Sequence, residues 1–322
     1  MKQNNLYFLI KPASSSCNLR CKYCFYANVT SLREIPNFGV MNETTMLNLI
    51  NYAFEVTTDN AYITFAFQGG EPTLAGPDFF KRFIAEVNKH RVKHQIFYRI
   101  QTNSYKINDE FFKIFKENNF LVGVSLDGYK ENNDYFRISV DKESCYKHIL
   151  QTVKRLENIG IEYNIVSVLT KRLAEKPRKF YEFIKKNNFR HVQIIPCLPP
   201  LDDSENFGLD AKGYAKFHKT LFDLWYQDLI QGNYYSINTF DNYIHLLRGN
   251  PNTICGINGV CTEQLIVESN GNIYPCDFYT LDELLLGNIN NMASMANLDY
   301  KKFYAYEDHR VKEHCKTCKF FK

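Results

Sequence analysis

The sequence predicts an α/β fold in which a parallel sheet forms a partial (β/α)6 barrel, similar to an incomplete TIM barrel. Short apolar runs alternate with amphipathic stretches, which is typical of parallel sheets with right-handed crossovers. A complete eight-unit barrel needs about 250 residues, whereas the alternation here ends near residue 235 after six units. We therefore expect a barrel domain over residues 1–235 and a small cysteine-rich extension with a β-hairpin over residues 236–322.

The expected strands are short runs rich in apolar, β-branched and aromatic residues. They are Leu6–Ile10, Tyr62–Phe67, Ile96–Gln101, Leu121–Leu126, Tyr163–Leu169 and His191–Ile195. The expected helices show a 3.6-residue apolar period, and they are Glu43–Val56, Asp78–His90, Asp109–Asn118, Glu143–Ile159, Pro177–Asn187 and Ala211–Ile230. Reacting groups of such folds gather at the carboxyl ends of the strands, so the loops after the strands are where we expect the site.

The composition predicts a cytoplasmic enzyme. The net charge of +4 is spread along the chain without a basic stripe, so nucleic acid is not an expected partner. No apolar run approaches the roughly 20 residues needed to cross a bilayer, and the first residues lack the apolar core of a signal peptide. In a reducing compartment, clustered thiols among the ten cysteines indicate metal binding more often than disulfides.

Three cysteines, Cys17, Cys21 and Cys24, follow the first predicted strand with C-x3-C-x2-C spacing. This spacing places three thiolates on one short loop, where they can hold three corners of a four-iron cluster. Because such a cluster normally takes four ligands, one iron is left open, as in catalytic metal sites. The alternative is a zinc knuckle, which usually pairs C-x2-C units. The motif is the signature of radical S-adenosylmethionine enzymes, which the chain resembles here.

The ends of later strands carry glycines and polar side chains. Gly69 and Gly70 follow the second strand, and they either admit a ligand to bare backbone or form a tight turn. With Glu71 and Pro72 they resemble the superfamily's GGEP element, which implies that Gly70 contributes to holding the amino group of the bound methionine moiety.

Short polar side chains at the ends of the third and fourth strands, in the runs Gln101-Thr102-Asn103 and Ser125-Leu126-Asp127-Gly128, are candidates to bond the cofactor ribose and carboxylate. Arg137 is a candidate for a forked contact with that carboxylate, or else a solvated charge. Leu198 is a candidate for packing on adenine, or else a core leucine. The resemblance adds Tyr23 to the cofactor-binding residues.

The C-terminal region contains a second set of cysteines. Cys255, Cys261, Cys276, Cys315 and Cys318 resemble the SPASM extension of peptide-modifying radical enzymes, which in its complete form carries two auxiliary four-iron clusters. By that resemblance the first cluster has three of its ligands here and the second has two, because the chain stops before further cysteines appear. The auxiliary ligand sets are therefore expected to be incomplete, and a zinc site at Cys315, Cys318 and two further ligands is the alternative.

A hairpin is expected among these C-terminal cysteines. The runs Leu265–Glu268 and Asn272–Tyr274 flank Ser269-Asn270-Gly271, in which Asn-Gly is typical of a tight turn between antiparallel strands. Cys145 and Cys197 match no ligand spacing and are expected to be buried small side chains.

Asp277 directly follows Cys276. Beside a cluster ligand at the mouth of a barrel, it is placed to take a proton from a substrate thiol or hydroxyl; the alternative is a surface aspartate that caps a turn. The surrounding run, residues 274–279, closely resembles the anaerobic sulfatase-maturating enzymes. Residues 11–15, 65–76 and 221–226 resemble them as well.

The resemblance implies a radical oxidoreductase that uses a four-iron cluster and S-adenosylmethionine. Its radical would take a hydrogen from a cysteine or serine in an unfolded sulfatase segment, while Asp277 removes the thiol or hydroxyl proton, giving Cα-formylglycine. An electron donor such as flavodoxin or ferredoxin is implied as a partner. Two alternatives stay open: a related maturase that forms crosslinks in a small peptide, and a truncated, catalytically silent metal-binding protein.

Overall fold

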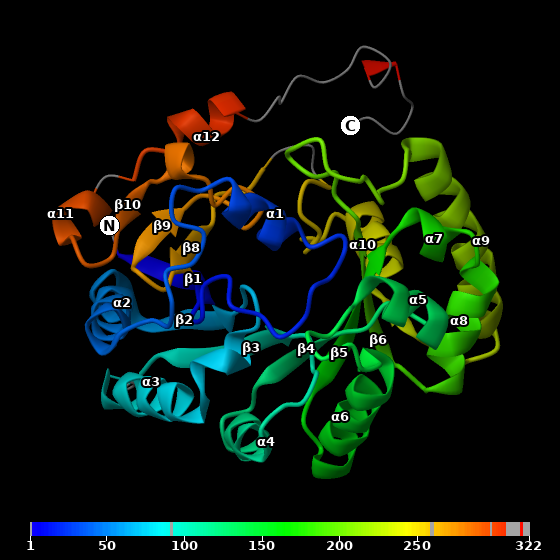
Figure 1. The fold of residues 1–322 in the computed structure, drawn as a ribbon, viewed down its shortest axis with the longest axis horizontal. Helices are drawn as coiled ribbons and strands as arrows, with labels where there is room; N and C mark the ends of the chain where they lie inside the picture. Colours follow the sequence, from blue (N-terminus) through cyan, green and yellow to red (C-terminus); the bar gives the residue numbers. More distant parts are fainter. Residues whose placement is uncertain (1, 91–92, 258–260, 297, 307–315, 318–322) are drawn as a thin grey trace.

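The computed structural model describes residues 2–90, 93–257, 261–296, 298–306 and 316–317. Its described strands form one curved ten-stranded sheet in the order β10-β9-β8-β1-β2-β3-β4-β5-β6-β7. The larger helices lie along the outer side of this curve (Figure 1). The sheet from β8 to β7 is parallel, and β9 and β10 are antiparallel. The partial barrel predicted from the sequence is therefore confirmed.

The described strands include every strand that the sequence predicts. They are β1 (Gln3–Lys11), β2 (Thr57–Phe67), β3 (Gln95–Thr102), β4 (Leu121–Ser125), β5 (Tyr163–Leu169), β6 (His191–Pro196), β7 (Ser236–Ile237), β8 (Leu265–Glu268), β9 (Asn272–Tyr274) and β10 (Gly287–Asn288). The six barrel strands and both hairpin strands are thus confirmed. The short strands β7 and β10 were not predicted, because two residues give no readable alternation.

Most of the described helices connect successive parallel strands, and the last two follow the final strand. They are α1 (Phe25–Ser31), α2 (Glu43–Glu55), α3 (Pro77–His90), α4 (Asp109–Glu117), α5 (Lys130–Phe136), α6 (Cys145–Ile159), α7 (Lys171–Ala174), α8 (Pro177–Lys186), α9 (Ala211–Ile230), α10 (Asn238–Leu247), α11 (Met292–Met295) and α12 (Lys301–Tyr306), with 3-10 turns η1 (Pro72–Ala75) and η2 (Asp282–Leu284). The six predicted helices are confirmed. Most of the helices missed are short ones, whose few turns give little periodicity, but α10, with 10 residues, was missed as well. Among the described residues, no helix is long and apolar enough to cross a membrane.

The two faces of the sheet differ in character because side chains alternate along each strand. On β1, Leu6, Phe8 and Ile10 are buried in the main core between sheet and helices. The alternate residues of the same strand, Tyr7 and Lys11 among them, face the inside of the curve. This alternation places polar and reactive side chains on the inner face, and the apolar core outside it holds the strands in position.

The C-terminal hairpin is part of the barrel sheet. β8 pairs in parallel with β1, with Phe8 opposite Leu265 and Lys11 opposite Glu268. At the other edge, β7 pairs with β6. Residues after 235 therefore extend the barrel sheet at both edges, through β7 at one edge and the hairpin at the other. The domain division at residue 235 stays a proposal.

Candidate active site

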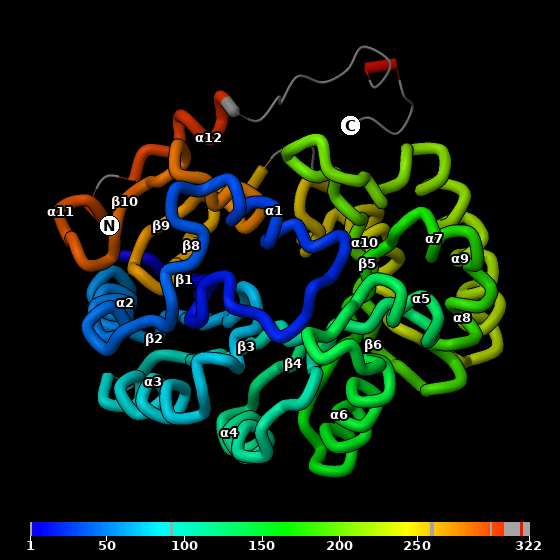
Figure 2. Tube along the Cα trace, in the orientation of Figure 1, coloured from blue at the N-terminus to red at the C-terminus, as the bar shows by residue number. Residues whose placement is uncertain are grey.

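The three cysteines of the first motif lie on the loop between β1 and α1, which runs within the ring of the curved sheet (Figure 2). Cys24 is the N-cap of α1, and its Sγ accepts a hydrogen bond from the Ala27 amide at 3.4 Å. The Cys17 Sγ accepts from the Leu19 amide at 3.4 Å and from Asn103 Nδ2 at 3.7 Å. As whole residues, the three cysteines are partly exposed. Donors aimed at the sulfurs suit a loop that holds a cluster, since hydrogen bonds to the sulfurs tune such groups.

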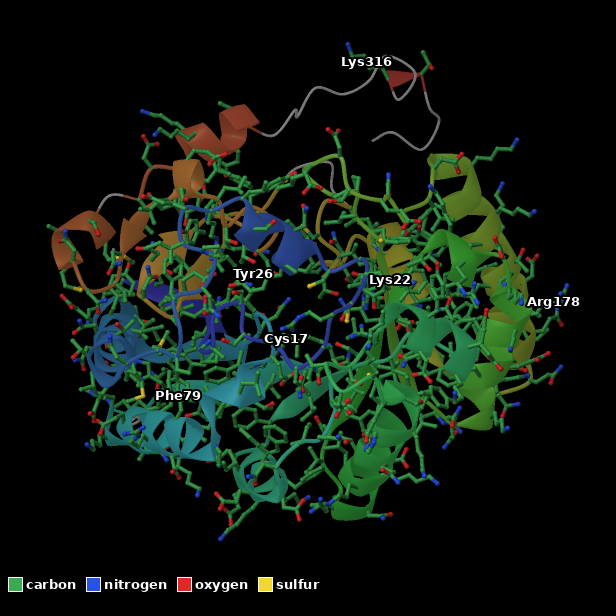
Figure 3. The ribbon with its side chains drawn as sticks, viewed as in Figure 1. Cys17, Lys22, Tyr26, Phe79, Arg178 and Lys316 are labelled. Atoms are coloured by element: carbon green, nitrogen blue, oxygen red, sulfur yellow. The ribbon has the colours of Figure 1, made fainter. Side chains whose placement is uncertain are left out.

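The backbone of this loop is held by the last residue of α5 and by the segment that follows it. The Arg20 amide donates to the Ile138 carbonyl at 2.6 Å, and the Lys22 amide donates to the Phe136 carbonyl at 3.0 Å. Cys17, Lys22 and Tyr26 lie together near the centre of the molecule in Figure 3. The loop is therefore fixed by main-chain contacts that do not depend on a ligand.

Burial governs the protonation of Cys17 and Cys21. It raises the pKa of Cys17 to about 11 and raises the pKa of Cys21 further, with Cys24 close enough to each to add to the effect. Cluster binding must therefore release the protons of these two thiols. Within the described ranges, no group of three or more His, Cys, Asp or Glu forms a site for a metal ion. A four-iron cluster is larger than one ion, and three interacting thiols on a fixed, partly exposed loop fit three of its corners.

The glycine pair after β2 packs against the cluster loop. The Gly70 amide donates to the Ser14 carbonyl at 2.9 Å, and the Glu71 amide donates to the Ser16 carbonyl at 2.8 Å. A Cβ added at Gly70 would lie 2.2 Å from the Ser16 oxygen. Gly70 is therefore required by the close approach of the chain itself, a reason that the motif alone does not reveal. Its contact with a cofactor stays a prediction.

Glu71 connects the loops after β1, β2 and β3. Its buried carboxylate accepts hydrogen bonds from Thr73 Oγ1 at 2.7 Å, Thr102 Oγ1 at 2.9 Å and the Asn103 amide at 2.7 Å. Burial raises the pKa of Glu71, while these donors oppose the rise. Asn103 in turn donates to Asn18 Oδ1 at 2.7 Å within the cluster loop. The carboxylate is thus a structural link, and no local pattern in the sequence indicated its partners.

A second buried carboxylate, Asp127, holds two of the predicted cofactor residues. Arg137 Nε donates to Asp127 Oδ2 at 3.0 Å, and the Tyr23 hydroxyl donates to the same oxygen. Arg137 is buried, so its interpretation as a solvated charge is wrong. Its Nη1 lies 4.0 Å from the Cys21 Sγ. With Nε engaged by Asp127, a forked contact with a cofactor carboxylate would use the Nη groups.

The remaining cofactor candidates lie at the carboxyl ends of β4 and β6. Ser125 is half-buried and ends β4, and Leu198 is 37% exposed just after β6. The core alternative for Leu198 is therefore wrong. Cys145 and Cys197 are buried, as predicted.

Asp277 lies at the carboxyl ends of β1 and β2, on the same edge of the sheet as the cluster loop. Its Oδ1 is 2.5 Å from Lys11 Nζ, and its Oδ2 accepts a hydrogen bond from Gln68 Nε2 at 2.9 Å. Lys11 is fully buried, with its Nζ 3.9 Å from the centre of the Tyr26 ring. Asp277 is 8% exposed, so the surface alternative is wrong. Lys11 was missed because a lysine at a strand end normally indicates solvent.

A second buried ion pair lies beside the first. Arg33 Nη2 is 2.8 Å from Glu268 Oε1, and the Tyr26 hydroxyl donates to the same oxygen at 2.5 Å. Arg33 Nε also donates to the Thr280 carbonyl. These contacts join the segment around α1 to the C-terminal hairpin.

The second cysteine set is partly described. Cys276 is buried after β9, Cys255 is exposed and Cys261 is partly exposed. Burial raises the pKa of Cys276 to about 12, with Cys255 and Cys261 near enough to contribute. Cys255 and Cys261 are thus each within electrostatic reach of Cys276, the third predicted ligand of the first auxiliary cluster. Cys315 and Cys318 lie outside the described residues.

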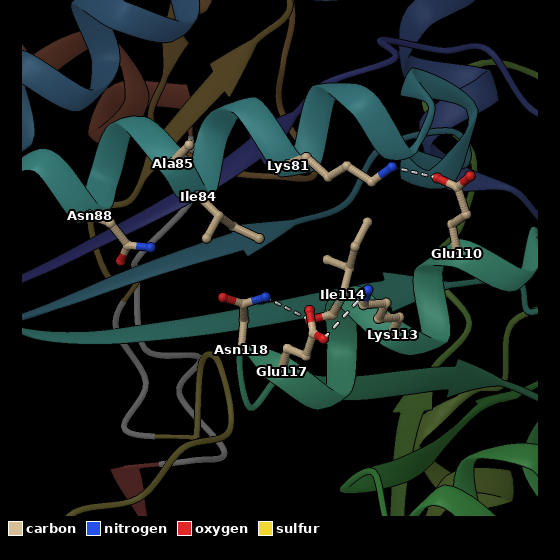
Figure 4. Close-up of a pocket in the computed structure, with 9 residues that line it drawn as sticks. All are labelled: Lys81, Ile84, Ala85, Asn88, Glu110, Lys113, Ile114, Glu117 and Asn118. Atoms are coloured by element: carbon tan, nitrogen blue, oxygen red, sulfur yellow. Dashed lines mark hydrogen bonds and ion pairs between the residues drawn. The ribbon is translucent and has the colours of Figure 1, made fainter.

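A groove of about 530 Å³ lies between α3 and α4 in the outer helical layer (Figure 4). Its lining includes the ion pair between Lys81 and Glu110 at 2.6 Å. None of the site residues above lines it, so it is separate from the predicted chemistry.

Comparisons with known proteins agree with this geometry. The chain matches the radical SAM superfamily over residues 12–186 and an iron-sulfur cluster-binding domain, SPASM, over residues 255–319. Together with the barrel and the three-cysteine loop, these matches define a radical SAM enzyme with a SPASM domain.

Comparisons with individual proteins show which family of radical SAM enzymes the chain belongs to. The chain is 43% identical to a cysteine-type anaerobic sulfatase-maturating enzyme of Clostridium novyi, over 98% of this chain and 86% of that protein. The chain belongs to the anaerobic sulfatase-maturating enzymes. A serine-type enzyme of Bacteroides thetaiotaomicron is 26% identical, over 98% of this chain and 80% of that protein. A solved structure of native anSMEcpe with bound AdoMet and Kp18Cys peptide has a TM-score of 0.89 at 37% identity, covering 98% of this chain and 87% of that chain.

The buried pair of Lys11 and Asp277 generates a stability prediction. Lys11→Met leaves Asp277 without its counter-ion, which typically costs about 3–5 kcal/mol for a buried pair. The free energy of unfolding, measured by anaerobic denaturant titration of the cluster-loaded protein, should fall by about that amount. Lys106→Met is the control: it removes an exposed lysine paired with Asp141 at 2.7 Å and should change little. Equal stabilities of the Lys11 variant and the wild type would contradict a buried ion pair.

Proposed function

We propose that this chain oxidises a cysteine of a sulfatase to Cα-formylglycine. The observation that carries the proposal is Asp277, a nearly buried carboxylate held by Lys11 and Gln68 on the edge of the sheet that also carries the cluster loop. A carboxylate fixed there is suited to take a proton from a substrate side chain presented to the barrel mouth.

The fit of the loop supports assigning a four-iron cluster to Cys17, Cys21 and Cys24. In this proposal the cofactor S-adenosylmethionine is bound by the segments of Tyr23, Gly70, Ser125, Arg137 and Leu198, while Cys255, Cys261 and Cys276 hold an auxiliary cluster. The bound groups supply the redox chemistry, which removes one hydrogen atom and one electron from the substrate. An external donor such as flavodoxin or ferredoxin provides the electron that starts each turnover.

The chain's own part in the reaction is proton removal and orientation. Asp277 Oδ2 accepts a hydrogen bond from Gln68 and Oδ1 accepts one from Lys11, and these two contacts orient the carboxylate at the rim. It takes the thiol proton of the substrate cysteine, which leaves a carbon–sulfur double bond once the hydrogen atom and electron are gone. Water then replaces sulfur, which departs as sulfide, and the aldehyde of formylglycine remains.

The relatives favour cysteine over serine as the substrate residue. Identity is 43% to the cysteine-type enzyme and 26% to the serine-type enzyme, with near-complete coverage of this chain in both. The solved relative with a bound peptide supports a peptide segment as the form in which the substrate is presented.

The cluster loop generates the first functional prediction. Cys17→Ala removes one of three ligands and should abolish reductive cleavage of S-adenosylmethionine, because the cluster then lacks a corner. The readout is 5′-deoxyadenosine formed under anaerobic reduction. Cys145→Ala, which changes a buried cysteine outside the loop, should retain cleavage. Normal 5′-deoxyadenosine formation by the Cys17 variant would rule out the radical mechanism.

Asp277 generates the second functional prediction. Asp277→Asn keeps the shape of the side chain but cannot accept a proton at neutral pH, and general-base catalysis contributes on the order of 10²–10⁴-fold in rate. Formylglycine formation on a cysteine peptide, followed by mass spectrometry, should fall by about that factor while cleavage of S-adenosylmethionine continues. Asp282→Asn, an exposed aspartate of the same segment, is the control and should behave as wild type. An unchanged formylglycine yield for the Asp277 variant would remove it as the base.

A further inference from the structure

Gln101 and Ser125 form a side-chain contact between β3 and β4 at the carboxyl edge of the sheet. Gln101 Nε2 donates a hydrogen bond to Ser125 Oγ at 2.8 Å. Both residues are half-buried, and both belong to the inner row, since Tyr98, Ile100, Val122 and Val124 occupy the outer core. The contact therefore lies where a ligand of the barrel interior can reach it.

Gly123 makes this contact possible. It is the register partner of Gln101, and a Cβ added to it would lie 2.1 Å from Gln101 Oε1 and 2.9 Å from Gln101 Cδ. Glycine is unfavourable within a strand unless another group approaches closely, and Gly123 is not among the glycines with positive φ. The amide of Gln101 lying over it thus explains why position 123 lacks a side chain.

The direction of the hydrogen bond determines what Ser125 can offer. A serine hydroxyl has one donor and two acceptor positions. Gln101 occupies an acceptor position, so the hydroxyl proton of Ser125 remains available for an anionic group inside the barrel. The end of β3 is itself rigid, because Thr102 and Asn103 both donate to the buried Glu71.

We propose that Gln101 is a positioning residue that orients the Ser125 hydroxyl toward the carboxylate of S-adenosylmethionine. Gly123 lacks a side chain and so leaves room for the Gln101 amide. This inference rests on the proposed function, which places Ser125 in the cofactor site. Gln101 acts through Ser125 and takes no part in the proton transfer assigned to Asp277.

The test is anaerobic equilibrium dialysis of S-adenosylmethionine with the cluster-loaded protein, without reductant, so that binding is measured apart from turnover. Gln101→Leu should raise the dissociation constant about 2- to 10-fold, the range expected for one hydrogen bond. Gly123→Ala should do the same by displacing the amide. Because both changes break one contact, the double variant should bind no more weakly than either single variant. Equal iron content and thermal unfolding establish that each variant is folded.

Two further variants sharpen the comparison. Gln101→Glu keeps the length of the side chain, but its carboxylate accepts a hydrogen bond from the Ser125 hydroxyl, which is then no longer available to the cofactor. This variant should bind S-adenosylmethionine more weakly than Gln101→Leu. Gln95→Leu is the matched control, because Gln95 is exposed on the same face at the other end of β3, and it should bind as wild type.

The outcomes separate this inference from the proposed function. Ser125→Ala with unchanged affinity would overturn both the placement of Ser125 and the role of Gln101. Weakened binding by Ser125→Ala with normal binding by Gln101→Leu and Gly123→Ala would overturn the positioning role alone. Additive effects of the Gln101 and Gly123 changes, or wild-type binding by Gln101→Glu, would also overturn it.

Discussion

The ion pair between Lys11 and Asp277 is the constraint on which the site depends. It joins the last residue of β1 to the segment after the C-terminal hairpin, and at 2.5 Å with a fully buried lysine it excludes water from between the charges. Burying two charges is costly unless their geometry and remaining hydrogen bonds are satisfied. Gln68 satisfies the second oxygen of Asp277. The position of the proposed base is therefore inseparable from the pairing of β8 with β1.

The cluster loop is held by a different kind of contact, made largely by the backbone. Main-chain hydrogen bonds connect it to the loop after β2 and to the segment after α5, and the missing side chain of Gly70 allows the first of these to form. Glu71 and Asp127 add two buried carboxylates, each satisfied by several donors. Such fully satisfied polar networks hold side chains in one arrangement, which is what a site for a reactive cofactor requires.

Much of this fold could be predicted from the sequence, because the apolar periodicity of the six barrel strands and their helices is strong. The partners of the buried charged side chains could not be predicted. Lys11 and Glu268 look like ordinary solvated charges until the parallel register of β1 and β8 places them side by side, and that register joins segments more than 250 residues apart. Of the two alternatives for Arg137, the solvated charge is wrong, because the side chain is buried against Asp127; nothing in the sequence indicated that partner. Cysteine spacing was informative because ligands of one cluster lie close in the chain.

Cysteine oxidation by this chain requires removal of a β-hydrogen and replacement of the sulfur by oxygen. The most direct measurement uses a sulfatase peptide whose reacting cysteine carries deuterium at the β-carbon, incubated anaerobically with cluster-loaded protein, S-adenosylmethionine and a reductant. We expect deuterium in 5′-deoxyadenosine and a peptide in which an aldehyde oxygen has replaced the cysteine sulfur. Unlabelled 5′-deoxyadenosine, or a peptide that retains its sulfur in a crosslink, would contradict the proposed reaction.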